Sequence, residues 1–86
     1  MEVFPNPFQD QAVLHFFLPK AGYIDMDVMD VLGARVLQTS SGYLADGRHQ
    51  IQLDGKDWPA GIYHLRIRYK SEDHIWYKTI RLQRIR

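Results

Sequence analysis

The stretch Tyr23-Ile24-Asp25-Met26-Asp27-Val28-Met29 decides the fold class, because apolar and acidic residues alternate along its middle. Successive side chains of an extended strand point to opposite faces of a sheet. The apolar residues of this stretch would therefore face a core, while Asp25 and Asp27 would face solvent. We predict a half-buried β-strand over residues 23–29.

The same period-two alternation continues on both sides of this stretch. It predicts an opening strand near residues 3–4 and further strands at 12–18, 34–39, 48–53, 62–69 and 75–83. Segments rich in Gly, Asp, Ser and Pro separate these strands, and no stretch has the apolar spacing of a helix. About seven short strands of this kind are typical of a small, immunoglobulin-like, antiparallel β-sandwich. We therefore predict an all-β fold.

The composition is that of one folded domain spanning residues 1–86, because half of this length could not bury a core of its own. With 45% apolar and 13% aromatic residues, the chain does not belong to the disordered class. Met1 joins directly onto strand-like residues 2–4. We therefore expect Met1 to be a start residue added to a segment of a longer protein.

Charge is balanced overall but not along the chain. The formal net charge of +1 gives no field that would attract nucleic acid. The last third nevertheless holds seven cations against Glu72 and Asp73 only. These cations are Arg66, Arg68, Lys70, Lys78, Arg81, Arg84 and Arg86. They indicate either solvated strand faces or a basic surface that steers a partner.

The third and sixth strands of such a sandwich are expected to be neighbours. Asp25 and Asp27 would then lie opposite His64, Arg66 and Arg68 on the outer surface. Exposed pairs of this kind contribute about 0.2–1 kcal/mol each and mainly fix the register of the strands.

Residue types with catalytic or metal-binding chemistry are present but form no distinctive site. The absence of Cys excludes disulfides, zinc–thiolate sites and cysteine nucleophiles. Ser40 and Ser41 are expected in a turn before Gly42, without the glycines that flank a nucleophile elbow. Residues 54–57 lack the alternating oxygen ligands of a calcium loop and are expected to form a turn. We expect no enzyme activity, no metal and no cofactor.

The histidines and the paired aspartates also form no distinctive site. His49 alternates with apolar Ile51 and Leu53, so we expect a partly buried, hydrogen-bonded strand residue rather than a metal ligand. Asp25 and Asp27 share one face, as glycosidase carboxylates would, but nothing else in the sequence indicates a cleft.

The aromatic residues allow two interpretations. Phe8, Phe16 and Tyr63 are expected in the core. A larger set could form a sugar-stacking platform, although Trp58 is also suited to cover one end of the sandwich. The residues of this second set are Tyr23, Tyr43, Trp58, Tyr69, Trp76 and Tyr77.

Short motifs occur in a fixed order along the chain, each combining turn residues with apolar alternation. They are Phe4-Pro5-Asn6-Pro7-Phe8, Leu14-His15-Phe16-Phe17-Leu18-Pro19, Val28-Met29-Asp30-Val31-Leu32-Gly33-Ala34-Arg35-Val36, Leu44-Ala45-Asp46-Gly47-Arg48-His49, Pro59-Ala60-Gly61-Ile62-Tyr63 and Lys78-Thr79-Ile80-Arg81-Leu82. Together they resemble, over nearly the whole chain, the type A C-terminal sorting domain of proteins exported by the type IX secretion system of Bacteroidota. Phe4 and Met29 stand where that family frequently has Tyr, and Asp46 stands where a small residue is common.

The resemblance implies a secretion signal without chemistry of its own. Its partners would be the type IX translocon and shuttle components, a cell-surface sortase that usually removes the domain, and a covalently linked N-terminal cargo. The domain would pass through the periplasm to the outer-membrane surface or the medium. The resemblance places the sorting motif at Pro5, Asn6, Pro7, Phe8, Asp30, Leu32, Gly33, Gly47, Pro59, Gly61, Tyr63, Lys78 and Arg81.

Lys78 has two interpretations, because alternation puts it on the same face as Trp76 and Ile80. A charge leaning inward on a terminal strand guards against edge-to-edge aggregation. Alternatively, Lys78 and Arg81 contact the secretion machinery. Exposed edge strands would also permit a weak dimer.

Two other functions fit the same sequence. One is a carbohydrate- or protein-binding sandwich appended to a secreted enzyme, with the aromatic residues as its contact surface. The other is a structural module similar to that of the flagellar hook-capping protein. Removal from the mature cargo would separate sorting from binding, because a binding module must stay attached.

Overall fold

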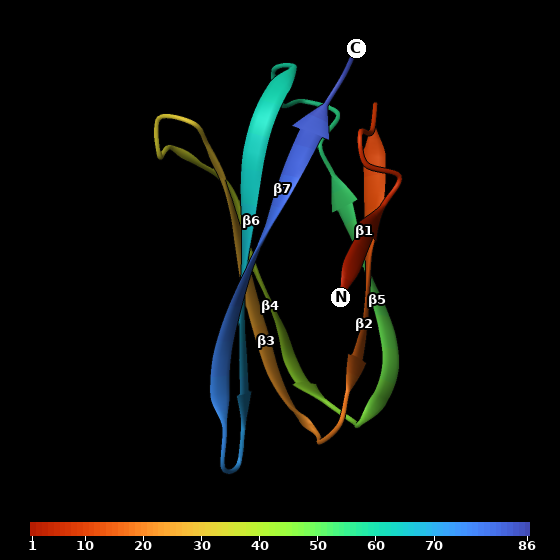
Figure 1. Cartoon of the computed structure of the whole chain (residues 1–86), viewed down its shortest axis with the longest axis vertical. Coiled ribbons are helices and arrows are strands. Elements are labelled where there is room, and N and C mark those ends of the chain that lie inside the picture. The colour runs from red at the N-terminus through yellow and green to blue at the C-terminus, as the bar shows by residue number, and fades with distance from the viewer.

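The computed structural model describes all 86 residues and contains seven strands in two sheets packed face to face (Figure 1). The strands are β1 (Glu2–Phe4), β2 (Gln11–Leu18), β3 (Gly22–Asp30), β4 (Arg35–Leu44), β5 (Gly47–Asp54), β6 (Gly61–Ser71) and β7 (Ile75–Arg84). One sheet has the order β1-β2-β5 and the other β4-β3-β6-β7, with every strand pair antiparallel. The predicted all-β sandwich is confirmed. The structure contains no helix that could span a membrane.

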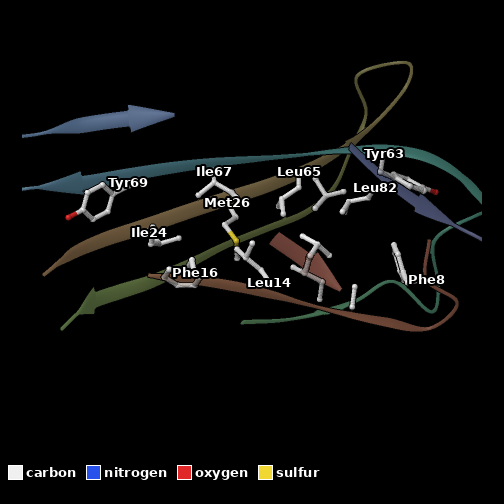
Figure 2. Close-up of a cluster of buried hydrophobic side chains, with 14 of the residues drawn as sticks. Phe8, Leu14, Phe16, Ile24, Met26, Tyr63, Leu65, Ile67, Tyr69 and Leu82 are labelled. Carbon is white, nitrogen blue, oxygen red and sulfur yellow. The ribbon is translucent and has the colours of Figure 1, made fainter. Parts of the chain in front are cut away.

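The core lies between the two sheets and consists of 16 buried hydrophobic residues (Figure 2). The stretch that decided the fold class supplies Ile24, Met26 and Val28, all at most 3% exposed. Leu14 and Leu18 of β2 face them from the other sheet and are fully buried. Burial of one such side chain stabilises the fold by about 1.5–3 kcal/mol, so the alternation fixes which face of each strand turns inward.

β3 and β6 are neighbours, and ion pairs join them on the outer face as expected. Asp27 lies opposite Arg66, which donates hydrogen bonds of 2.9 and 2.8 Å to its two carboxylate oxygens. Asp25 lies opposite Arg68, with 3.5 Å between the charged atoms. The bonds from Arg66 hold the pKa of Asp27 below its usual value. The prediction is wrong for His64, which lies opposite Met29 and not opposite an aspartate.

β4 is longer than predicted, because residues 40–44 continue the strand instead of forming a turn. Ser40 pairs with Asp25 and donates a 2.6 Å hydrogen bond to its carboxylate. An extra residue follows, Gly42 has φ +72°, and the Ser41 hydroxyl accepts a bond from the Ile24 amide. This β-bulge absorbs the turn-like residues within the strand. The turn expected at Ser40 and Ser41 is therefore wrong.

Antiparallel pairing sorts the connections between strands to the two ends of the sandwich. The segments 5–10, 31–34 and 55–60 lie at one end, where β7 also finishes (Figure 1). The segments 19–21, 45–46 and 72–74 lie at the opposite end. β7 is the outer strand of the wider sheet, and it contacts β6 along its length and β1 at a few residues.

Candidate functional site

Three of the predicted motifs lie at the end of the sandwich where β7 finishes, although the turn around Gly33 projects away from the other two (Figure 1). These are the segments around Asn6, Gly33 and Pro59. Gly47 lies at the opposite end, where it begins β5. Lys78 and Arg81 lie on β7 itself. The candidate site is therefore β7 with the segments that pack against it.

Asn6 bonds to β7 as a neighbouring strand would. Its side-chain Nδ2 donates to the Arg81 carbonyl at 2.8 Å, and its Oδ1 accepts from the Gln83 amide at 3.1 Å. The carboxamide thus supplies the donor and acceptor that a backbone peptide group would supply. Both β7 groups point away from β6, on the open edge of the sheet.

Phe8 continues this pairing with its own backbone. Its amide donates to the Gln83 carbonyl at 2.9 Å, and its carbonyl accepts from the Ile85 amide at 2.8 Å. The Phe8 ring is 1% exposed and meets Trp58 edge-on, with 5.9 Å between ring centroids. We call residues 5–8, bonded in this way to residues 81–85, the N-terminal clamp.

The two prolines of the N-terminal clamp are exposed and bring no amide donor to β7. Each follows a cis peptide bond, Phe4-Pro5 and Asn6-Pro7. The bonds to β7 therefore come from Asn6 and Phe8 alone. This explains in physical terms why the motif alternates proline with a residue that reaches β7.

Arg84 joins β7 to the segment between β5 and β6. Its Nε donates to the Gly55 carbonyl at 2.7 Å, and its Nη2 donates to the Lys56 carbonyl at 2.9 Å. In the sequence, Arg84 stands out only as one of the seven cations of the last third. The signal that could have identified it is its alternation with buried Leu82, which puts Arg84 on the inner face at the end of the strand.

The Pro59–Tyr63 motif forms a tyrosine corner at the start of β6. The Tyr63 hydroxyl donates to the Pro59 carbonyl four residues earlier, and its ring packs 5.1 Å from that of Trp58. Burial raises the pKa of the Tyr63 hydroxyl, with a smaller contribution from Asp30. Phe8, Trp58 and Tyr63 are all core residues, as Figure 2 shows for Phe8 and Tyr63. Gly61 lies two residues before Tyr63 and has a positive φ of +156°.

The Asp30–Gly33 motif is a tight turn between β3 and β4. The Asp30 carboxylate accepts from the amides of Leu32 and Ala34, both at 2.9 Å. Gly33 has φ +86°, a conformation that favours glycine, and donates to the Asp30 carbonyl. Asp30 and Gly33 thus build the turn, while the Leu32 side chain is 90% exposed at its tip.

His49 near Gly47 has the structural role expected of it. Its ring is half-buried, stacks on Phe16 with 5.5 Å between centroids, and bonds to the Ala45 carbonyl at 2.6 Å. This hydrogen bond closes the turn between β4 and β5. No three His, Asp or Glu side chains gather closely enough to hold a metal ion.

Lys78 and Arg81 are exposed and make no ion pair. Lys78 alternates with half-buried Trp76 and Ile80, yet it stays in solvent because β7 is the outermost strand of the wider sheet. Arg81 offers its side chain to solvent, while its carbonyl is held by Asn6. These two cations are the members of the predicted motif that a partner can reach on β7.

The aromatic set proposed as a sugar platform does not form one surface. Trp58 and Tyr69 are buried, and Trp76 packs against Tyr69 with 5.4 Å between centroids. Tyr23 and Tyr43 form an exposed edge-to-face pair across β3 and β4. The platform of six residues is therefore wrong, because Trp58 and Tyr69 are buried and Trp76 packs against the core.

The family comparison agrees with this architecture. The family model described as "secretion system C-terminal sorting domain" matches residues 2–81.

The chain belongs to that family of sorting domains. Its members are C-terminal signals for type IX secretion, which take the protein that carries them to the cell surface or the medium. The family is a signal domain and not a catalytic one. No curated protein and no solved structure gives a significant match.

The matched region of the sorting domain begins within β1 and ends at Arg81. It contains Asn6 and also Arg81, the first residue of β7 whose backbone bonds to Asn6. Three residues of β7 follow it: Leu82 completes the core, Gln83 belongs to the clamp, and Arg84 bonds to the β5–β6 segment.

Proposed function

We propose that this sorting domain directs an N-terminal cargo through the type IX outer-membrane translocon and is then removed by a cell-surface sortase. The observation that carries the proposal is the N-terminal clamp, which joins the first and last motifs of the family into one site on β7. The domain would cross the periplasm attached to its cargo. Removal would occur upstream of β1, since nothing within the folded domain needs to be cut to release a preceding cargo.

The residues of the motif divide into two roles under this proposal. Phe8, Asp30, Gly33 and Tyr63 act through the fold, because they are buried or build turns. Lys78 and Arg81 act by contact, because their charges are exposed on β7 and unpaired. Leu32 joins them as an exposed apolar tip on the β3–β4 turn.

The test is secretion of a periplasm-targeted fluorescent protein fused ahead of residues 2–86 in a host with a working type IX system. We expect fluorescence in the medium or on the surface, and its loss when the translocon is deleted. A fusion that stays in the periplasm, in cells that export a control fusion, would contradict the proposal.

Removal of residues 78–86 should also abolish export, but that truncation deletes Leu82, a fully buried core residue. A Lys78→Ala, Arg81→Ala double variant separates recognition from folding, because both side chains are exposed. We expect this variant to keep the wild-type melting temperature and to lose export. Export at the wild-type level would show that recognition by the secretion machinery does not depend on these two cations.

A further inference from the structure

The outer edge of β7 is divided into a covered half and an open half. The N-terminal clamp occupies the Arg81 carbonyl, both backbone groups of Gln83 and the Ile85 amide, all of which point away from β6. Residues two apart in a strand direct their backbone groups to the same side. The register between β6 and β7 runs without a break from Gly61↔Arg84 to Lys70↔Ile75. Tyr77 and Thr79 therefore also direct their amide and carbonyl groups away from β6.

The outward backbone amide and carbonyl groups of Tyr77 and Thr79 have no hydrogen-bond partner in the chain. None of the seven backbone hydrogen bonds outside the strand ladders involves either residue. The side chains around them are accessible as well, since Tyr77 is 73% exposed and Ile75 56% exposed. A row of unpaired backbone groups beside exposed apolar side chains is the arrangement to which another extended segment adds as a strand.

Charge indicates what kind of segment fits. Residues 74–86 contain four Lys and Arg residues and no Asp or Glu. Lys78 and Arg81 on this strand make no ion pair. The carboxylates that line the outer-face groove beside this strand, those of Asp25 and Asp27, are already bound by Arg68 and Arg66. An acidic segment would meet unpaired cations here, whereas a basic one would be repelled.

There is also room for the side chains of such a segment. A shallow groove of about 480 Å³ lies on the outer face beside Tyr77 and Thr79. Arg66 and Arg68 of β6 line it, together with Asp25 and Asp27 of β3, to which they are paired. An added strand on the β7 edge would place every second side chain over this face.

The other sheet edges are less suited to accept a strand. β1 has only three residues, and β4 is interrupted by register shifts at two places. β5 carries charges of both signs, Arg48 and Asp54, at its two ends. A second copy of this chain is a poor occupant of the β7 edge, because two antiparallel β7 strands would bring their unpaired cations together.

We propose that the open half of β7, residues 75–80, takes an extended acidic segment of the export machinery as a fifth strand of the wider sheet. This inference rests on the proposed function, since it names the chemistry of the partner that reads the sorting domain. Main-chain bonds to Tyr77 and Thr79 would give the affinity. Lys78 and Arg81, whose side chains lie on opposite faces of the sheet, would select acidic side chains on both faces of the partner strand.

The direct test is a titration of isotope-labelled chain 1–86 with a ten-residue peptide that repeats Glu-Glu-Val-Val, so that Glu lies on both faces of the added strand, followed by amide NMR. We expect the amide signals of Tyr77 and Thr79 to shift and their hydrogen exchange to slow. A peptide with Lys in place of Glu should not produce these changes, and added salt should weaken the binding of the acidic peptide. Changes centred on other strands, or equal binding of the Lys peptide, would overturn the proposal.

Two variants test the two parts of the contact. Thr79→Pro removes one outward amide, which an edge strand tolerates because that amide does not bond to β6. It should weaken peptide binding about five- to tenfold, as expected for the loss of one hydrogen bond. Lys78→Glu with Arg81→Glu should abolish binding of the acidic peptide.

The matched control is Lys56→Glu, which changes an exposed cation in the β5–β6 segment, at the end of the sandwich away from residues 75–80. It should bind the acidic peptide like the wild type. Each variant is first checked for a wild-type melting temperature. Equal loss of binding in the control would show that net charge, and not this edge, governs the interaction.

The same variants in the secretion assay distinguish this inference from the proposed function. If the wild-type fusion is not exported, the proposed function fails. If the wild type is exported and folded Thr79→Pro is exported equally well, the sorting role stands and the edge-docking inference is wrong. Shifts at Tyr77 and Thr79 that depend on protein concentration without peptide would assign the edge to a second copy and also overturn the inference.

Discussion

At the scale of single residues, the sorting domain is organised by side chains that bond to backbone. The Asn6 side chain bonds to two backbone groups of β7, and the Asp30 carboxylate accepts from two amides of its own turn. Arg84 takes two carbonyls of the β5–β6 segment. Each of these residues satisfies backbone groups that the sheet ladders leave without a partner, and this explains why polar residues stand at these places.

Asn6→Ala is expected to destabilise the domain by about 1–2 kcal/mol, because it leaves the Arg81 carbonyl and the Gln83 amide without the side-chain partner. Urea unfolding gives the change in free energy, and amide exchange should speed up at Gln83. Gln9→Ala removes a single bond to the Arg86 carbonyl and serves as control, with an expected change within about 0.5 kcal/mol. Equal stability of Asn6→Ala and wild type would show that the N-terminal clamp contributes nothing to folding.

Gly55→Ala is expected to cost about 1–3 kcal/mol by overpacking. An added Cβ would lie 2.7 Å from the Phe8 ring and 2.8 Å from that of Trp58, and both rings are buried. Thermal unfolding measures the loss. Gly33→Asn is the comparison, because that position has open space and Asn tolerates its positive φ, so the melting temperature should change little. An unchanged melting temperature in Gly55→Ala would mean that the aromatic cluster adapts freely.

At the scale of strands, the outer-face ion pairs set the register of β3 against β6. Asp27 is the central carboxylate, since Arg66 bonds to both of its oxygens and Arg35 lies 3.7 Å away. Its side chain is 16% exposed, less than that of any cation paired with it. A carboxylate held this way favours its ionised form in the folded state.

The stability of the domain should therefore depend on Asp27 at acid pH. Because the folded-state pKa of Asp27 is lowered, its stabilising contribution is present above about pH 4 and is lost as the pH falls through the folded value. Urea midpoints between pH 2 and pH 7 should fall more steeply at the acid end in wild type than in Asp27→Asn. Parallel curves for the two proteins would show that the pair with Arg66 does not change the proton affinity of Asp27.

Charge reversal tests the same contact at neutral pH. Asp27→Lys should lower the melting temperature, because it places a cation opposite Arg66 and beside Arg35. Asp46→Lys makes the same charge change in the exposed β4–β5 turn, where we expect little effect. If both variants melt alike, the register does not depend on this pair.

Alternation predicted the strands well, because burial on one face of a strand repeats every second residue. A short window of the sequence is enough to show this pattern. It placed Ile24, Met26 and Val28 in the core, and it placed Asp25 and Asp27 opposite Arg68 and Arg66. It failed at Ser40 and Ser41, because a bulge inserts one turn-like residue into a strand without ending it. The neighbouring strand decides that outcome, and its influence is not visible in a local pattern.

The candidate site was predicted only in part. The motifs named Asn6 and Arg81, but their contact joins residues that are 75 positions apart. Neither residue type predicts the other, because an exposed Asn and a backbone carbonyl have many possible partners. Arg84 was missed for the same reason, since its partners are two carbonyls in a segment that carries no matching charge.

At the scale of the whole molecule, the two ends of the sequence complete each other. The family match ends at Arg81, yet Leu82 is fully buried and residues 83–85 receive the N-terminal clamp. Loss of one buried Leu side chain costs about 2–5 kcal/mol. A domain of this size is stable by only about 4–13 kcal/mol in total.

A chain of residues 1–81 is therefore expected to be largely unfolded at 25 °C. Circular dichroism and amide NMR dispersion report this directly. Arg86→Ala in the complete chain is the control, because the structure uses only the backbone carbonyl of that residue, and it should fold normally. A folded 1–81 chain would show that residues 82–86 and their contacts are not needed for folding.

The pairing of Asn6 with Arg81 and Gln83 also has a kinetic consequence. Asn6 is separated from its two partners by 75 and 77 positions in the sequence, so these contacts form only when almost the entire chain closes into a loop. Such closure slows folding relative to a protein built on local contacts. No shorter portion of the sequence holds both partners of this contact. A nascent or partly threaded polypeptide therefore stays open, and the domain closes only after both of its ends have emerged into the same compartment.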